Sequence, residues 1–315
     1  MTGVVYKSTG SWYHVKDATG ALIPCRIKGK FRIEGLTSTS PVAVGDVVDA
    51  TLKDTQDGTQ GIITHIHERK NYIVRKSVNL SKQIHIIAAN IDCAFLLITL
   101  NNPPTHTAFI DRFLATAAAY EIETILLFNK EDTYDEEEKA QLNQLSKIYS
   151  DIGYDCIEIS ALKGFNIDMV KTHMANKTCM LSGHSGVGKS TLVNTLAPGL
   201  NIKTSEISTM HQQGQHTTTF AEMHDLDFGA CIVDTPGIRG FGVVNMENEE
   251  IGDYFREFFT LKGKCKFNNC LHLEEPKCAV KVAVEQGKIA ASRYKSYTQI
   301  LEGDDLHYRT DFWEV

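Results

Sequence analysis

The chain has 315 residues, 42% of them hydrophobic and 23% charged, with a formal net charge of −7. This length allows two or three domains of ordinary soluble composition. The negative balance excludes nucleic-acid binding through the overall field, so any RNA contact must use local patches. The longest apolar runs are too short to span a bilayer and the N-terminus lacks a signal pattern, so we expect a cytoplasmic protein without membrane contact.

Residues 1–71 predict a small β-barrel. Five short strand-like runs, at 3–5, 12–15, 22–27, 47–51 and 61–67, are separated by Gly and Asp turn residues. Five strands in so short a segment are typical of an oligonucleotide-binding barrel. If the segment that contains them is extended, four alternating basic residues share one face suited to RNA phosphates: Arg26, Lys28, Lys30 and Arg32. A solvated strand face explains the same pattern equally well.

Residues 72–245 predict an α/β domain, since strands alternate with helices from residue 91 onward. We expect strands at 91–99, 124–128, 156–159, 177–181 and 230–233, and helices at 109–120, 135–150, 191–196 and from 166. This alternation implies a mostly parallel sheet with helices on both faces. Ligand loops of such sheets lie at the carboxyl ends of the strands.

A complete phosphate loop follows the strand at 177–181. It reads Gly183-His184-Ser185-Gly186-Val187-Gly188-Lys189-Ser190, with Thr191 opening the next helix. The glycines let the backbone N–H groups face phosphates, Lys189 reaches the β- and γ-phosphates, and the Ser190 hydroxyl is a Mg²⁺ ligand. His184 fills a variable position of the loop.

A guanine-reading motif stands earlier in the chain, at Asn129-Lys130-Glu131-Asp132, with Ser160-Ala161 after the next strand. The Asp132 carboxylate accepts two hydrogen bonds from guanine, which adenine cannot offer. Asn129 ties this loop to the phosphate loop, Lys130 lies along the purine face, and the Ser160-Ala161 backbone meets the guanine O6. These motifs precede the phosphate loop, so the order of an ordinary GTPase is circularly permuted.

The remaining switch motifs follow the phosphate loop. Asp234 holds a Mg²⁺-bound water and the Gly237 N–H meets the γ-phosphate, but the next residue is Ile238, which cannot orient a water. His216 is the nearest candidate for that task, although a surface loop histidine explains it equally well. A neighbouring threonine, Thr218, is the expected second Mg²⁺ ligand.

Residues 246–315 predict a short helical domain closed by metal. Cys265, Cys270, His272 and Cys278 match a tetrahedral structural Zn²⁺ site, one per chain. The other cysteines lie in apolar runs, where we expect small buried hydrophobes. They are Cys25, Cys93, Cys156, Cys179 and Cys231.

Together these motifs resemble the bacterial RsgA family of small ribosomal subunit biogenesis GTPases over essentially the whole chain. Further segments resemble its signatures: Lys28 to Arg32, Val44-Gly45-Asp46, Arg69-Lys70-Asn71 and Gly214 to Thr218. The resemblance implies a barrel, a permuted GTPase domain and a zinc domain. It also implies late maturation of the small subunit, hydrolysis stimulated by that particle, and a catalytic His216. Gln215 departs from the arginine usual in the family.

Three functions fit this pattern. The first is a monomeric, ribosome-stimulated GTPase that binds GTP or GDP with Mg²⁺ and contacts rRNA through its outer domains. The second is a stand-alone regulatory G protein with a protein partner, which the net charge of −7 favours. The third is an RNA-binding module that senses GTP without hydrolysing it, which Ile238 favours.

Overall fold

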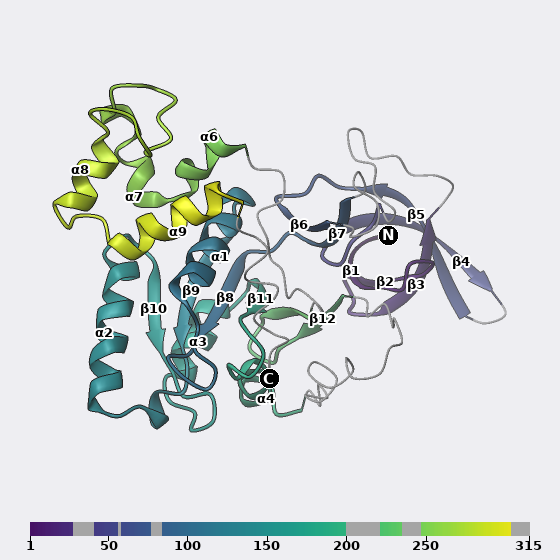
Figure 1. Ribbon diagram of the computed structural model, residues 1–315. Helices are drawn as coiled ribbons and strands as arrows, with labels where there is room; N and C mark the ends of the chain where they lie inside the picture. Colours follow the sequence, from purple (N-terminus) through teal and green to yellow (C-terminus); the bar gives the residue numbers. More distant parts are fainter. Residues whose placement is uncertain (28–40, 56–57, 77–83, 200–220, 235–246, 304–315) are drawn as a thin grey trace, which may run out of the picture.

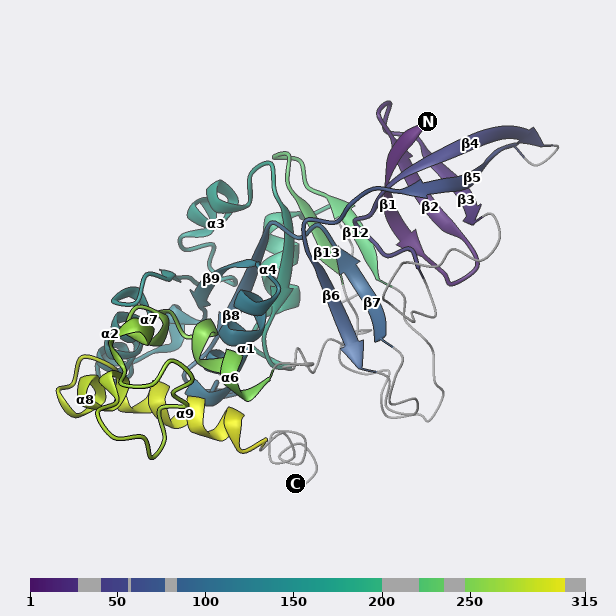
Figure 2. The same ribbon diagram turned by 90° about the horizontal axis from the view of Figure 1, so that it is seen from above.

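A barrel, a parallel sheet and a helical module follow one another along the chain. The computed structural model describes residues 1–27, 41–55, 58–76, 84–199, 221–234 and 247–303. Figures 1 and 2 show the barrel at one end of the molecule and residues 247–303, the C-terminal module, at the other, with the parallel sheet between them. Within the described ranges, no helix has both the length and the apolar character needed to cross a membrane.

Five strands close into the predicted N-terminal barrel. They are β1 (Thr2–Ser8), β2 (Tyr13–Asp17), β3 (Leu22–Ile27), β4 (Val47–Thr55) and β5 (Gly58–Ile66). They pair in the order β1–β2–β3–β5–β4, and β4 returns to β1, so the sheet closes on itself. Alternate residues, among them Val5, Val15 and Ile63, are buried in one core. The oligonucleotide-binding type of barrel is thus confirmed.

The central domain is the expected parallel sheet. Its strands are β8 (Cys93–Ile98), β9 (Glu123–Phe128), β10 (Asp155–Glu158), β11 (Thr178–Ser182) and β13 (Cys231–Asp234), with β12 (Glu222–Asp225) antiparallel beside β13. They lie in the order β10–β9–β8–β11–β13–β12. Every residue of β8 is buried, and its side chains alternate between two cores, as a strand covered on both faces requires.

Helices cover both faces of this sheet. On one face lie α1 (Thr107–Ala119) and α2 (Glu136–Ser150), and on the other α3 (Ile167–Met174) and α4 (Lys189–Leu196). A short 3₁₀ turn, η1 (Glu131–Thr133), precedes α2. Asp135 caps α2: its carboxylate accepts from the Glu138 N–H, and the Asp135 N–H donates to the Glu138 carboxylate. This capping box sets the start of α2 one residue after the predicted 135.

The barrel and the parallel sheet share one continuous sheet. Lys7 of β1 pairs with Glu222 of β12, and their side chains form an ion pair of 2.8 Å. On the same two strands, the Tyr6 hydroxyl of β1 donates to Asp225 of β12 at 2.7 Å, and Lys16 of β2 also contacts that carboxylate. β12 therefore connects the barrel to β13, the strand that ends at Asp234.

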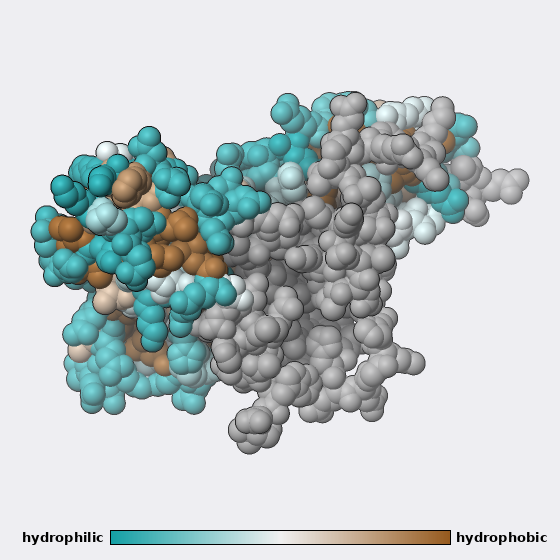
Figure 3. Space-filling model, turned by 45° about the horizontal axis from the view of Figure 1, so that its top comes forward, coloured by the Kyte–Doolittle hydropathy of each residue, from teal (hydrophilic) through white to brown (hydrophobic). Residues whose placement is uncertain are grey.

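The C-terminal module is helical, as expected. It contains α6 (Asn248–Ile251), η2 (Gly252–Tyr254), α7 (Arg256–Phe259), η3 (Lys262–Lys264), α8 (Ala279–Glu285) and α9 (Ala291–Leu301). Its own core contains Ile251, Phe255, Phe258 and Tyr297. Figure 3 shows apolar patches on its surface among hydrophilic residues, and Phe259, Phe267 and Val282 are each at least two-fifths exposed.

A buried ion cluster fastens this module to the central domain. Arg293 of α9 is 1% exposed and donates to Asp111 of α1 at 2.8 Å. Its guanidinium also donates two hydrogen bonds to the Glu257 carboxylate of α7, at 2.7 and 3.0 Å. The Tyr149 hydroxyl of α2 donates to the same Asp111 oxygen at 2.9 Å. Four helices of the two domains, α1, α2, α7 and α9, thus contribute side chains to one buried ion cluster.

Two of the family-like segments build the joint between the barrel and the central domain. Arg69 donates to both carboxylate oxygens of the fully buried Asp46, at 2.6 and 2.7 Å. Gly45 has φ of +89°, and a Cβ there would lie 2.1 Å from the Ala89 carbonyl. Only glycine fits this close approach. Val44-Gly45-Asp46 and Arg69-Lys70-Asn71 are therefore structural residues of the joint.

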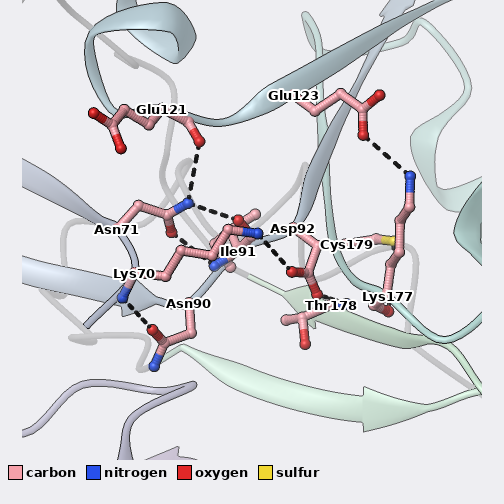
Figure 4. Close-up of polar contacts among 10 residues, drawn as sticks. All are labelled: Lys70, Asn71, Asn90, Ile91, Asp92, Glu121, Glu123, Lys177, Thr178 and Cys179. Atoms are coloured by element: carbon pink, nitrogen blue, oxygen red, sulfur yellow. Dashed lines mark hydrogen bonds and ion pairs between the residues drawn. The ribbon is translucent and has the colours of Figure 1, made fainter. Parts of the chain in front are cut away.

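Beyond the joint lies a hairpin that the sequence analysis did not anticipate, β6 (Tyr72–Lys76) and β7 (Ile84–Ala89). Figure 4 shows how Asn71 fixes its base: the side chain accepts from the Ile91 N–H at 2.9 Å and donates to the Ile91 carbonyl at 2.8 Å. Asp92 in turn accepts from Lys70 and from the Thr178 N–H. The joint thus contacts the amino ends of β8 and β11, opposite the loops at their carboxyl ends.

Candidate functional site

Strand order brings the predicted nucleotide motifs together. The Asn129 loop follows β9, Ser160 follows β10, the phosphate loop follows β11, and Asp234 ends β13. Because these strands are parallel, all four motifs meet at one edge of the sheet. The permuted order along the chain therefore leaves the spatial arrangement of a GTP site intact.

The phosphate loop has the backbone that an anion cradle needs. Gly183, Gly186 and Gly188 have φ of +140°, +83° and +100°. A Cβ at Gly188 would lie 2.3 Å from the Asn129 amide nitrogen, so the loop tolerates no side chain there. Lys189 donates to the carbonyls of Gly183 and His184 at 2.7 and 2.6 Å, which folds its ammonium over the loop.

The other residues of the loop divide between exposed and buried positions. Ser185 and Gly186 are exposed, whereas Val187 is fully buried in the core below the loop. Ser190 and Thr191 form the first turn of α4, whose N-cap is Gly188. An exposed strip of backbone above a buried anchor, at the start of a helix, is the arrangement that binds phosphates.

Asn129 connects the three loops that follow β9, β10 and β11. Its buried side chain donates to the Val187 carbonyl of the phosphate loop at 2.7 Å and accepts from the Ala161 N–H at 2.9 Å. The next residue, Lys130, has φ of +69° and is partly exposed, so its stem is available to a base. Asparagine is the fitting residue because it has both a donor and an acceptor.

The base loop is arranged around Asp132. The Ser160 hydroxyl donates to one Asp132 oxygen at 2.5 Å, and the Lys163 N–H donates to that hydroxyl at 3.0 Å. This chain orients the carboxylate. The Ser160 N–H donates to the Phe165 carbonyl and the Ala161 N–H to Asn129. Guanine O6 can therefore reach the Ala161 N–H only by sharing it with Asn129, a constraint that the motif alone did not show.

Several predicted residues lie outside the described ranges: Lys28, Lys30, Arg32, His216, Thr218 and Gly237. Asp234 ends β13, and only its backbone is described. Arg26 is exposed on the barrel, with its guanidinium 3.9 Å from the centre of the Trp12 ring. A cation stacked on an aromatic ring beside open solvent is a suitable contact for a nucleotide.

The four predicted zinc ligands converge. The ligand atoms of Cys265, Cys270, His272 and Cys278 all lie within 4.8 Å of one another. His272 Nδ1 is 3.7 Å from the Cys265 sulfur and 3.3 Å from that of Cys278. Tetrahedral Zn²⁺ bonded to such ligands spaces sulfur and nitrogen by about 3.5 Å. The donor set and its spacing fit zinc, with Nδ1 facing the metal position.

Neighbouring residues hold this cluster in shape. The Glu275 carboxylate accepts from the Leu271 and Leu273 N–H groups at 2.7 and 2.8 Å. The hydroxyls of Tyr294 and Tyr297, on α9, donate to the carbonyls of His272 and Leu271 at 2.6 and 2.8 Å. Burial raises the pKa of Cys270 to about 12, the opposite of what a bound cation does to a thiol. Through the two tyrosine bonds, the metal-binding loop is attached to α9, the helix that also carries Arg293.

The remaining cysteines follow the expected pattern in part. Cys25, Cys93 and Cys179 are buried, and burial raises the pKa of each thiol. Cys156 and Cys231 are only partly buried: Cys156 lies on β10, the edge strand of the sheet, and the Cys231 thiol contacts the polar groups of Tyr6 and Asp225. The prediction of small buried hydrophobic residues therefore holds for three of these five cysteines.

The fold and these loops define a class: a circularly permuted GTPase with an oligonucleotide-binding barrel before it and a Cys₃His module after it. The profile of the RsgA GTPase family matches residues 66–244, and that of the RsgA N-terminal domain matches residues 2–62. The chain belongs to the RsgA family, and it is a GTP hydrolase.

Relatives match this chain over all or nearly all of its length. The chain is 63% identical over 314 residues to a protein named small ribosomal subunit biogenesis GTPase RsgA from Christiangramia forsetii, covering 100% of both. It is 53% identical to a Bacteroides fragilis protein of that name, covering 96% of both. The crystal structure of YjeQ from Thermotoga maritima matches 96% of this chain and 97% of its own, at 35% identity and a TM-score of 0.78. That of YloQ, a circularly permuted GTPase, has 30% identity, a TM-score of 0.75, and coverage of 96% and 94%.

Proposed function

We propose that this chain hydrolyses GTP during late assembly of the small ribosomal subunit, in the cytoplasm, as a monomer whose turnover the subunit stimulates. The observation that carries the proposal is the identity of 63% over the full length to a protein named small ribosomal subunit biogenesis GTPase. The Asn129 bonds to Val187 and Ala161 support it, because they bring the predicted base and phosphate loops together.

In this proposal the predicted site residues bind and orient the nucleotide. Asp132, held by Ser160, accepts from the guanine N1–H and amino group, which gives selectivity over adenine. The Gly183-to-Gly188 backbone binds the phosphates, and Lys189 moves from the loop carbonyls to the β- and γ-phosphates. Ser190, Thr218 and Asp234 would hold Mg²⁺, directly or through water. The ion would neutralise charge on the phosphates.

Hydrolysis needs a group that orients water, and Ile238 cannot provide it. We assign this role to His216, by resemblance to the family's switch histidine. A partner that positions His216 against the attacking water would raise the rate, by about 10³- to 10⁵-fold if it completes the site. Slow turnover of the free protein follows from the same reasoning.

The two outer domains are the proposed RNA contacts. The barrel offers Arg26 stacked on Trp12, together with Lys28, Lys30 and Arg32. The C-terminal module offers Lys262, Lys264 and Lys266 in the same stretch of chain as the exposed Phe259 and Phe267, and the Lys266 ammonium lies 5.0 Å from the centre of the Phe267 ring. One Zn²⁺ held by Cys265, Cys270, His272 and Cys278 would keep this module folded.

Nucleotide state would reach both outer domains through short connections. β12 pairs with the barrel strand β1, and β13 beside it ends at Asp234. The C-terminal module begins ten residues after Gly237. GTP would favour the arrangement in which both outer domains bind RNA, and hydrolysis would favour release of the RNA.

Co-sedimentation with purified small subunits tests the proposal. We expect binding with a non-hydrolysable GTP analogue that is at least tenfold tighter than with GDP, and weaker binding for Arg26→Glu. Equal binding in both nucleotide states would contradict the release mechanism. Tight association with another protein and none with the subunit would favour the regulatory G protein instead.

A further inference from the structure

One loop at the nucleotide edge belongs to none of the four motifs. Residues 99–109 comprise the loop after β8 and the first turn of α1, and we call them the bridging segment. β8 lies between β9, which carries the base loop, and β11, which carries the phosphate loop. Because all three strands are parallel, the bridging segment must emerge between those two loops.

The bridging segment is attached to the base loop at two points. The Lys130 ammonium donates to the Asn102 carbonyl. The Tyr134 hydroxyl accepts from the Leu100 N–H at 3.0 Å and donates to the Asn129 carbonyl at 2.7 Å. Lys130 is in the left-handed region, so these bonds hold a backbone conformation that would otherwise be unfavourable.

It is also packed on the phosphate loop at two points. A Cβ built on Gly186 would lie 3.2 Å from Pro103 Cδ, so the proline covers that glycine closely. Further on, Phe109 lies against His184, with ring centroids 3.8 Å apart and planes inclined by 34°. The partner of Phe109 is thus the side chain of His184, which fills a variable position of the phosphate-loop motif.

The segment is internally rigid, which lets it transmit position. The Thr105 N–H donates to the Thr99 carbonyl at 2.8 Å, and the Thr99 hydroxyl donates to the Pro103 carbonyl at 2.6 Å. Thr99 and Thr105 are 1% and 7% exposed, so water does not compete with these bonds. Helix α1 then continues from Phe109 into the core through Ile110 and Phe113.

We propose that the bridging segment is a further positioning element of the nucleotide site, and that Phe109 is the positioning residue that fixes the phosphate loop through His184. An already ordered loop loses less conformational entropy on binding phosphate, so nucleotide affinity rises without any contact between Phe109 and the ligand.

The electrostatics of the pair suit this role. Burial, together with the charges of Lys189 and His106, lowers the pKa of His184 to about 4. The imidazole is therefore neutral at pH 7 and packs on Phe109 as an uncharged ring. Lys189 remains the positive group that the phosphates meet.

The phosphate loop holds GDP as well as GTP, so loss of the contact should weaken both equally. An aromatic pair of this kind corresponds to about 2- to 13-fold in affinity. We expect Phe109→Ala to raise the Kd of both nucleotides by such a factor and to raise KM, with kcat at saturation unchanged. Phe109→Tyr, which keeps the ring, should restore the affinity.

Titration of the full chain with fluorescent GDP and a fluorescent non-hydrolysable GTP analogue measures these values without ribosomal subunits. The result is thus independent of the proposed role in assembly. Phe113→Leu is the matched control: it removes a ring from the buried face of the same helix and should lower the melting temperature while leaving both Kd values unchanged. If Phe109→Ala does not fold, Phe109→Leu removes the ring with less loss of volume.

A double-mutant cycle gives the decisive comparison. If Phe109 acts through His184, Phe109→Ala combined with His184→Ala should bind no more weakly than the weaker single variant. An unchanged Kd in both Phe109→Ala and Phe109→Leu would overturn the proposal. Effects of the two single variants that multiply in the double variant would overturn it as well.

Discussion

Arg293→Met should detach the C-terminal module from the central domain. The wild-type guanidinium makes three bonds of 2.7 to 3.0 Å to Asp111 and Glu257, whose side chains are 0% and 7% exposed. Methionine keeps much of the volume but leaves two buried carboxylates without a cation. Removing one partner from a buried ion pair costs about 3–5 kcal/mol. We therefore expect a loss of that size in the free energy of unfolding.

Urea unfolding followed by circular dichroism measures the loss, and limited proteolysis between the central domain and the module shows whether docking is the step affected. The second variant, Asp111→Asn, identifies the cause. An amide needs no cation, so Arg293→Met should cost at least 1 kcal/mol less in the Asp111→Asn background.

The loss should also depend on pH in a defined direction. Burial raises the pKa of Asp111, and the Arg293 guanidinium opposes that rise. Without the guanidinium the folded-state pKa rises further, so the folded variant binds a proton that the unfolded chain has released. The deficit relative to wild type is therefore smallest at low pH and grows as pH rises through the folded-state pKa of Asp111. A deficit below about 1 kcal/mol at pH 7, or one that grows on acidification, would refute this reasoning.

Three further predictions concern the site. Asp132→Asn should weaken GTP binding by about 10- to 150-fold, since a bond to a charged group is lost, and should favour xanthosine triphosphate; unchanged GTP affinity would show that the base lies elsewhere. Metal analysis should find about one Zn²⁺ per chain, and Cys270→Ser should lose the metal together with the helical signal of the module; a folded, metal-free variant would contradict this. His216→Ala should abolish subunit-stimulated hydrolysis while GTP binding persists, and intact stimulation would remove His216 from the mechanism.

The elements of the fold were predictable where the pattern is local. β8 is apolar at every position and bounded by polar residues, so its existence and depth followed from the sequence. The Asp135 and Glu138 pair marked the start of α2. The hairpin β6–β7 was not predicted, because its fixing contacts come from Gly45, Asn90 and the bridge between Val44 and Ala88, which are distant in sequence.

The site was predictable in its loops but not in its connections. Parallel strands bring their carboxyl ends together, so the four motifs had to meet. The Asn129 bonds to Val187 and Ala161 span 58 and 32 residues, and no local pattern encodes them. Arg293 reads as a solvated residue of an amphipathic helix, although its partner Asp111 stands 182 residues earlier. The bridging segment did leave one signal: Asn101-Asn102-Pro103-Pro104 is a turn at the carboxyl end of a buried strand.

The most direct test of the account is the rate of GTP hydrolysis with and without purified small ribosomal subunits, at moderate salt. The account predicts slow turnover alone and strong stimulation by small subunits, with none from large subunits or unrelated RNA. Tight GTP binding with no stimulation by small subunits would contradict it and would make the chain a regulatory G protein with a different partner.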